Sequence, residues 1–223
     1  MARPTKADAQ ATRRRLLLAA TAAFSRRGLQ GTTLRSVAQE AGVTMPTIHH
    51  YFGSKQGLFD ACRKQAVQEL ASELVPLGTF MGTVRDQVVT EASTELPLLV
   101  ERLVREGSRA ARSHRMALQL VWRPLVDDGW LDPVWTKTVL EPFLGQITSA
   151  LAEPLGRSPV SLRLDVQGVV ALTLRYALST PEHLAQLAGL PAPASPADGE
   201  RTVTALDDHL VSLAQRLLGV RND

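Results

Sequence analysis

Apolar residues near the start of the chain recur at the spacing of one face of a helix. Leu16, Ala20 and Phe24 lie at i, i+4 and i+8, which predicts a helix from about residue 12. Gly28 follows this stripe, and a glycine with a left-handed backbone commonly ends a helix. Three further helices are predicted over about 33–40, 44–52 and 55–75. Thr32 or Thr33 is expected to cap the first of these, and Thr44 the second, by accepting from backbone N–H groups one turn on.

The rest of the chain has the same helical character. Alanine, leucine, arginine, glutamine and glutamate, which are good helix formers, dominate the composition. Pro76 is expected to end the fourth helix, and the next is expected to bend at Pro97. The expected later helices cover about residues 80–111, 113–126, 133–152, 162–179, 181–188 and 200–218. With no strand pattern beside them, the sequence predicts an all-α fold.

Basic residues are concentrated near the N-terminus. Residues 1–60 carry nine Lys and Arg against three Asp and Glu, a net charge of +6, whereas the remainder carries sixteen against nineteen, a net charge of −3. This asymmetry favours a module that binds a polyanion on a mildly acidic body. The alternative is an ordinary solvated basic face.

Several classes of protein lack support in the sequence. Every uncharged apolar stretch, 166–174 among them, is too short to cross a bilayer, and no secretory signal is visible. The single cysteine, Cys62, fits a reducing cytoplasm. No common catalytic motif is present, so no enzyme and no cofactor are expected. Because His49 and His50 are adjacent, they point about 100° apart on a helix, and no metal site is expected.

Residues 34–53, LRSVAQEAGVTMPTIHHYFG, have the pattern of a helix-turn-helix motif. Ala38 provides the small residue where the two helices touch, and Gly42 fits a turn that needs a left-handed backbone. Apolar positions at the required places are Val37, Ala41, Val43, Ile48 and Tyr51. The alternative is an ordinary helical hairpin inside a bundle.

The segment from Thr12 to Cys62 resembles the DNA-binding domain of the tetracycline-repressor (TetR) family of bacterial transcription regulators. The most specific matches are AFSRRG (23–28), TT (32–33), VA (37–38), AGV (41–43), TI (47–48) and YFGSK (51–55). The resemblance implies an all-helical homodimer, with a helix-turn-helix DNA-binding domain over 10–70 and a helical ligand-binding and dimerisation domain over 71–223. It also implies a ligand-responsive repressor that binds a palindromic double-stranded DNA operator. The alternative is a helical architectural or ligand-binding protein without ligand-controlled repression.

The recognition helix of such a motif enters the major groove with its N-terminus first. Met45 and Pro46 are therefore expected to reach base edges, while Lys55 is expected to reach a phosphate. The family usually has tyrosine where this chain has His49, and that tyrosine contacts the DNA backbone. The predicted DNA-binding residues are Thr33, Arg35, Thr44, Met45, Pro46, Thr47, His49, His50, Tyr51 and Lys55.

The C-terminal part offers candidates for two further sites. Aromatic residues can line an apolar pocket for an unknown small-molecule effector, although at helical spacing they can equally be core. The pocket candidates are Met116, Trp122, Trp130, Trp135, Phe143, Arg175 and Tyr176. Apolar stripes on the last two long helices predict a dimer interface, or packing within the chain. The interface candidates are Val169, Leu172, Leu206, Leu210, Leu213 and Leu217.

Overall fold

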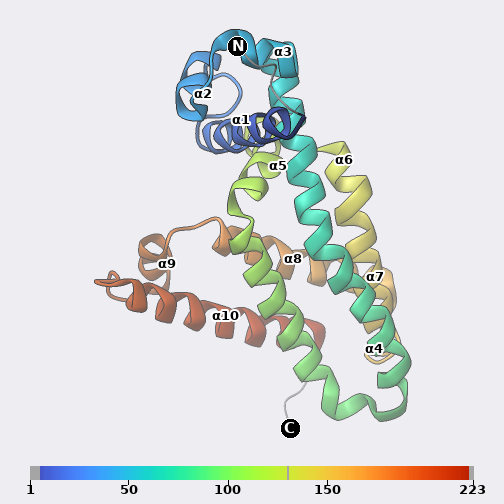
Figure 1. Ribbon diagram of the computed structural model, residues 1–223. Coiled ribbons are helices and arrows are strands. Elements are labelled where there is room, and N and C mark those ends of the chain that lie inside the picture. The colour runs from blue at the N-terminus through green and yellow to red at the C-terminus, as the bar shows by residue number, and fades with distance from the viewer. Residues whose placement is uncertain (1–5, 130, 221–223) are drawn as a thin grey trace. The chain divides into compact units, whose positions relative to one another are not determined.

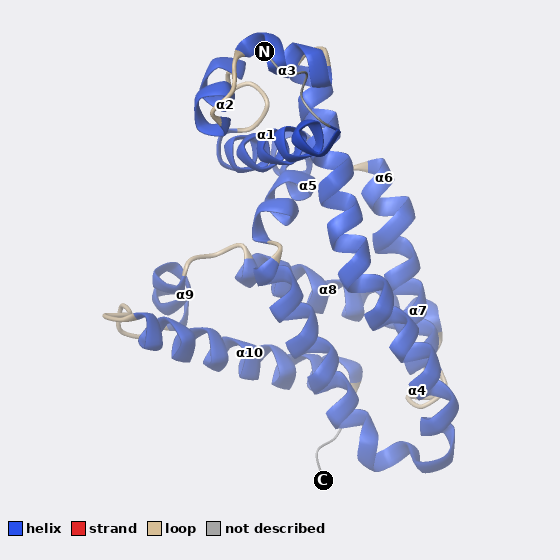
Figure 2. Cartoon of the chain, viewed as in Figure 1, coloured by secondary structure: helices blue, strands red, loops and turns tan. Residues whose placement is uncertain are grey.

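The computed structural model describes residues 6–129 and 131–220, and the described chain is built of helices joined by loops and turns (Figure 1, Figure 2). No strand occurs among these residues, so the predicted all-α fold is confirmed. The helices in the first part of the chain are α1 (Lys6–Arg27), α2 (Leu34–Ala41), α3 (Met45–Phe52), α4 (Lys55–Ser113) and α5 (Arg115–Asp128). Those in the second part are α6 (Pro133–Trp135), α7 (Glu141–Ala152), α8 (Pro159–Ala177), α9 (Pro181–Ala188) and α10 (Pro196–Leu218), with a π-helical segment over Thr136–Leu140.

The largest departures from the predicted helix boundaries are in α1 and α4, each for a local reason. α1 begins at Lys6 and not near residue 12, because the added turn consists of good helix formers, and Asp8 lies at the positive end of the helix dipole. α4 continues through Pro76 and Pro97 and does not end at the first of them. A proline inside a helix removes one backbone hydrogen bond, which can bend the helix without ending it, and Figure 1 shows the ribbon of α4 strongly bent.

Three later helices begin with the same local signal. Ser158, Thr180 and Ser195 each accept a hydrogen bond from the backbone N–H three residues further on. A proline follows each of them at the first helical position, where its missing N–H has no intrahelical partner to lose. This signal places the starts of α8 and α10 a few residues before the expected 162 and 200.

The chain divides into two units. The first unit contains the residues up to Leu70 together with Met116–Trp135, and the second contains Ala71–Arg115 and the residues from Thr136 on. In the first unit α1 packs on α2, and α2 on α3. Its core is formed by large side chains with 0% exposure: Leu16, Phe24, Val37, Ile48 and Leu58. The apolar stripe predicted on the first helix is therefore confirmed.

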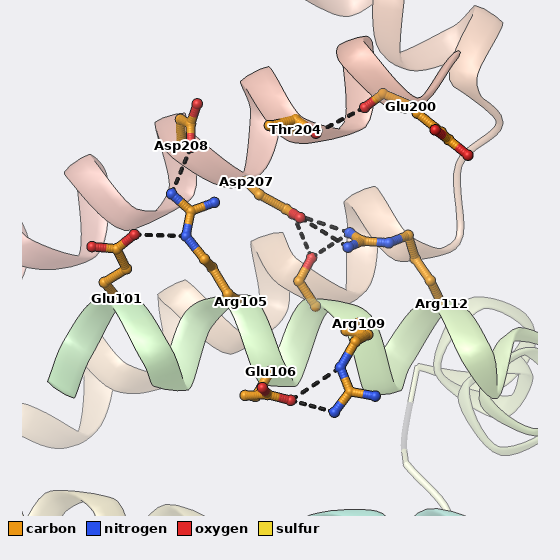
Figure 3. A network of polar contacts seen from close by, with 10 residues as sticks. Glu101, Arg105, Glu106, Arg109, Arg112, Glu200, Thr204, Asp207 and Asp208 are labelled. Atoms are coloured by element: carbon orange, nitrogen blue, oxygen red, sulfur yellow. Dashed lines mark hydrogen bonds and ion pairs between the residues drawn. The ribbon is translucent and has the colours of Figure 1, made fainter. Parts of the chain in front are cut away.

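In the second unit, α8 packs against both α7 and α10, and α9 packs against α10. Leu162 of α8 and Leu210 of α10 are fully buried there. A polar network ties α10 to the green part of α4 (Figure 3). At its centre the buried carboxylate of Asp207 accepts hydrogen bonds from Ser108 and Arg112. Packing and polar contacts together fix α10 within its own unit.

Candidate DNA-binding surface

The turn between α2 and α3 has the geometry that a helix-turn-helix motif needs. The Thr33 hydroxyl oxygen accepts a hydrogen bond from the Ser36 N–H at 3.1 Å, which caps the start of α2. Gly42 ends α2 with φ +64°, a left-handed conformation that a residue with a Cβ rarely adopts. The Val43 N–H then donates to the Ala38 carbonyl at 3.0 Å, which closes the turn. The predicted roles of Thr33, which caps the start of α2, and of Gly42, which forms the turn after α2, are confirmed.

The start of α3 differs from expectation in one detail. Thr44 has the extended backbone of a capping residue, but its side chain makes no capping hydrogen bond, so that expectation is wrong. The reason lies in its neighbours. Pro46 has no N–H that could donate to the Thr44 hydroxyl. That hydroxyl instead forms a hydrogen bond with the Thr47 hydroxyl, at 2.9 Å between the two oxygens. The two hydroxyls therefore form a pair at the leading end of the helix.

One face of α3 is buried and the opposite face is open to solvent. Ile48 has 0% exposure and anchors the helix on the core, as predicted. Met45 is 37% exposed although it is a large apolar residue. The predicted DNA-binding residues that are exposed are Thr33, Arg35, Thr44, Met45, Pro46, His49 and His50. Those that are half-buried are Thr47, Tyr51 and Lys55. All ten belong to the first unit.

His49 is held at the end of α3 by a contact that the sequence did not predict. Its Nδ1 lies 2.8 Å from the Gly53 carbonyl oxygen, while the Gly53 N–H donates to the His49 carbonyl at 2.9 Å. Gly53 has φ +72°, which turns the chain back toward the ring. The side chain of His49 is therefore fixed by its own helix end, and it remains exposed.

Two basic side chains are also held in place near α3. The Lys55 Nζ donates to the Thr32 carbonyl oxygen at 3.3 Å, which leaves two of its three N–H donors for other partners. The Arg13 guanidinium of α1 lies over the Phe52 ring at 5.5 Å, a cation–π contact. Arg13 is one of the nine basic residues of positions 1–60, but this contact depends on how α1 and α3 pack and is not visible in the sequence.

The aromatic pocket candidates are distributed over both units. Met116 (43% exposed), half-buried Trp122 and Trp135 (1% exposed) belong to the first, while Trp130 lies outside the described residues. The candidates in the second unit are Phe143 and Tyr176, both half-buried, and exposed Arg175. The carboxylate of Asp132 accepts from the Trp135 backbone N–H at 2.9 Å and forms an ion pair with Arg63. The role of the aromatic pocket candidates in ligand binding stays a prediction.

A different hollow appears in the second unit. A groove of about 860 Å³ lies between the α9–α10 connection and α10, a volume in the range of small-molecule sites. Its polar lining includes Arg112, Glu182, Glu200, Thr204 and Asp207. None of the predicted pocket residues is among its lining residues.

The predicted dimer-interface residues also divide into two groups. Leu206 (8% exposed) and Leu210 (0%) are buried within the single chain, whereas Leu217 is 41% exposed. The half-buried members are Val169, Leu172 and Leu213. The most exposed large apolar side chains of α8 are Val160 at 83% and Leu164 at 77%, and neither is among the predicted interface residues. An apolar stripe shows that a face is covered, but not whether the cover comes from the same chain.

The fold and the turn geometry together define a helix-turn-helix protein, in which a larger helical part follows the motif along the chain. A family model described as bacterial regulatory proteins, tetR family, matches residues 16–62. The chain is 39% identical to the probable HTH-type transcriptional regulator ArpR of Pseudomonas putida over 106 residues, which cover 42% of this chain and 50% of the relative. It is 38% identical to the HTH-type transcriptional regulator TtgR, also of Pseudomonas putida, over 106 residues, with the same coverage. The chain thus spans about half the length of these curated relatives.

Solved structures extend the likeness of the fold to nearly the whole chain. A TetR-family transcriptional regulator from Mesorhizobium loti superposes with a TM-score of 0.61 at 16% identity, covering 97% of this chain and 98% of that one. A TetR-like regulator from a Rhodococcus species gives a TM-score of 0.60 at 20% identity, covering 98% and 100%. Residues 16–62 thus match the domain of the tetR family, and nearly the whole chain shares the fold of these two solved regulators.

The curated relatives that the chain matches over 106 residues are transcriptional regulators, in agreement with the expectation that the chain is not an enzyme. Among the described residues, no helix combines the length and the apolar character needed to span a membrane.

Proposed function

We propose that this chain is a homodimeric, ligand-responsive transcriptional repressor that binds a palindromic operator through α2 and α3. The observation that carries the proposal is the two-sided character of α3. Fully buried Ile48 fixes the helix on the core, while Met45 and Pro46 face solvent at its N-terminus. An exposed, rigidly mounted helix N-terminus is what enters the major groove in this class of motif.

The proposed contacts divide into two kinds. Met45 and Pro46 are apolar and stand at the leading end of α3, where they can contact thymine methyl groups and so contribute to sequence preference. Arg35 and Lys55 provide positive charge in the first turns of α2 and α4, the helices before and after α3 in the chain, and contact phosphates. Thr33, Thr44, Thr47 and Tyr51 add neutral hydroxyl groups that can donate to phosphate oxygens, while His50 adds a second exposed imidazole beside His49.

The homodimer is proposed to form through α8 and α10. Val160 and Leu164 lie four residues apart on α8, and both are more than three-quarters exposed in the single chain. Leu217 adds exposed apolar surface on α10, the helix that packs beside α8. Two helices from each chain would form a four-helix bundle about a two-fold axis. An operator read by two such related heads is an inverted repeat.

Ligand control is proposed as a shift between two arrangements of the dimer. An effector that binds more tightly to the arrangement whose half-site spacing does not match the operator shifts the dimer toward that arrangement. It can weaken operator binding by no more than its own difference in affinity for the two arrangements. Two aromatic candidates of the second unit, half-buried Phe143 and Tyr176, remain the proposed lining of the effector site. Without an effector, the same fold would serve as an architectural DNA-binding protein.

Fluorescence anisotropy separates the ligand-responsive repressor from the architectural protein. It is measured on a labelled duplex that the protein enriches from a pool of random sequences. We expect binding that weakens steeply with salt, because phosphate contacts release counterions. We also expect at least one compound of a metabolite library to release the duplex. Salt-dependent binding that no compound reverses would support the architectural alternative, and absence of DNA binding would contradict the proposal altogether.

A further inference from the structure

The imidazole of His49 has only one nitrogen free to face DNA. The other nitrogen, Nδ1, lies 2.8 Å from the Gly53 carbonyl oxygen, which can only accept a hydrogen bond. Nδ1 must therefore carry the proton, since a bare Nδ1 would place two lone pairs against each other. In the neutral ring this assigns the lone pair to Nε2.

A neutral His49 is consequently the wrong partner for a phosphate. Phosphate oxygens only accept hydrogen bonds, and the neutral Nε2 also only accepts. When the ring takes up a proton, Nε2 becomes a donor with a positive charge, while the Nδ1–H bond to Gly53 is kept. A tyrosine hydroxyl in the same place would donate without any change of charge.

We infer that His49 contacts an operator phosphate through Nε2, and only as the imidazolium, so that operator binding takes up a proton at this residue. The inference rests on the proposed function. Its sign follows from linkage: DNA binds the charged form better, so affinity is high at low pH and is lost as pH rises. Imidazole side chains as a class change charge between about pH 5 and 8, and this sets the pH values at which the inference is tested.

The surroundings of His49 contain one other group of the same chemistry. Glu40 of α2 is engaged by Arg26 at 3.5 Å, and the Arg13 guanidinium lies over Phe52. His50 is exposed and has its ring against Tyr51, with centroids 5.3 Å apart. Besides His49, the charged or titratable residues of α2 and α3 are Arg35, Glu40, His50 and Tyr51, and α4 begins with Lys55. Of these, His50 must be controlled for.

Operator affinity is measured by fluorescence anisotropy at pH 6.0 and 8.0, at constant ionic strength, on the duplex selected by the protein. Each histidine can raise affinity by at most about tenfold per pH unit, and a dimer has two copies of His49. We expect the wild-type chain to bind at least about tenfold more tightly at pH 6.0. The slope of log affinity against log salt should also steepen at the lower pH by about 1.8 per dimer, because each added phosphate contact contributes about 0.9.

Three variants separate the alternatives. His49→Gln and His49→Tyr, which offer neutral donors, should bind with an affinity and a salt slope that no longer depend on pH over this range. His50→Gln should keep the pH dependence of the wild type. Thermal unfolding of each variant, followed by circular dichroism at both pH values, checks that the fold is retained.

Two results would overturn the inference while leaving the proposed function intact. The first is operator binding that is equally tight at both pH values, or whose pH dependence survives in His49→Gln. The second is tighter binding at pH 8.0 that depends on one base pair, since this would mean that the neutral Nε2 accepts from an adenine or cytosine amino group in the major groove. Absence of operator binding at either pH would overturn the inference and the proposed function together.

Discussion

Asp207 and Asp208 are neighbours in α10 with very different surroundings, and this makes them a matched pair for substitution (Figure 3). The carboxylate of Asp207 accepts three hydrogen bonds from α4: from the Ser108 hydroxyl at 2.6 Å and from the two Arg112 amino groups at 3.0 and 2.8 Å. Its side chain is 11% exposed. Asp208 accepts from Arg105 at 2.6 Å, but its side chain is 58% exposed.

The expected effects on stability follow from these environments. Asp207→Ala leaves the Arg112 guanidinium without its bidentate carboxylate and the fully buried Ser108 hydroxyl without an acceptor. Breaking a buried pair costs about 3–5 kcal/mol. Because the Arg112 side chain is 31% exposed and can regain water, we expect a loss of about 2–3 kcal/mol. Asp208→Ala removes a solvent-exposed ion pair, for which about 0–1 kcal/mol is expected.

Urea unfolding followed by far-UV circular dichroism measures both losses. All proteins must be compared at the same protomer concentration, because dimer formation would add to the apparent stability. With a slope of about 2 kcal/mol per molar urea, the midpoint of Asp207→Ala should lie about 1 M below that of the wild type, and that of Asp208→Ala within about 0.5 M of it. Equal losses for the two variants would refute the argument that burial, and not the presence of an ion pair, determines the contribution.

Three further predictions concern DNA contacts, assembly and the thiol. Lys55→Ala should weaken binding to every duplex and flatten the slope of log affinity against log salt by about one unit per subunit, whereas Met45→Ala should change which half-site is preferred. If both variants lower affinity by the same factor for every sequence of an operator library, the assignment of Lys55 to phosphates and Met45 to bases is wrong. Leu164→Glu should give a folded monomer in sedimentation, and a variant that stays dimeric would place the interface elsewhere. Burial raises the pKa of the Cys62 thiol to about 11. Iodoacetamide at pH 8 should therefore modify it slowly in the native protein and quickly in urea, and rapid native modification would contradict its burial.

Local periodicity was enough to predict the helix-turn-helix unit. Leu16 and Phe24 of α1, Val37 of α2 and Ile48 of α3 were identified from their spacing alone, and all four are fully buried. Gly42 was identified because the turn needs a left-handed residue, and its φ of +64° confirms it. The buried face of a short helix and the residue type of a turn depend on residues that are close in the sequence. The local sequence pattern is therefore sufficient to predict them.

Features that depend on distant residues or on side-chain rotamers were not predictable. Asp207 and Arg112 are 95 positions apart, and no spacing rule connects them. The apolar stripe of α10 indicated correctly that Leu210 is covered, but the structure places it inside its own chain. Substituting Leu210 by a charged residue would therefore test folding and not dimerisation, whereas a substitution at the exposed Leu164 of α8 tests assembly.

Selection from a pool of random duplexes tests the central proposal most directly. The purified chain is used to enrich bound DNA over several rounds, and the retained sequences are determined. A two-fold symmetric dimer with α3 in successive major grooves should enrich an inverted repeat whose half-site centres lie about 10 base pairs, or a multiple of that, apart. Enrichment of a single asymmetric site, or of no sequence at all, would contradict the proposal that this chain reads a palindromic operator as a homodimer.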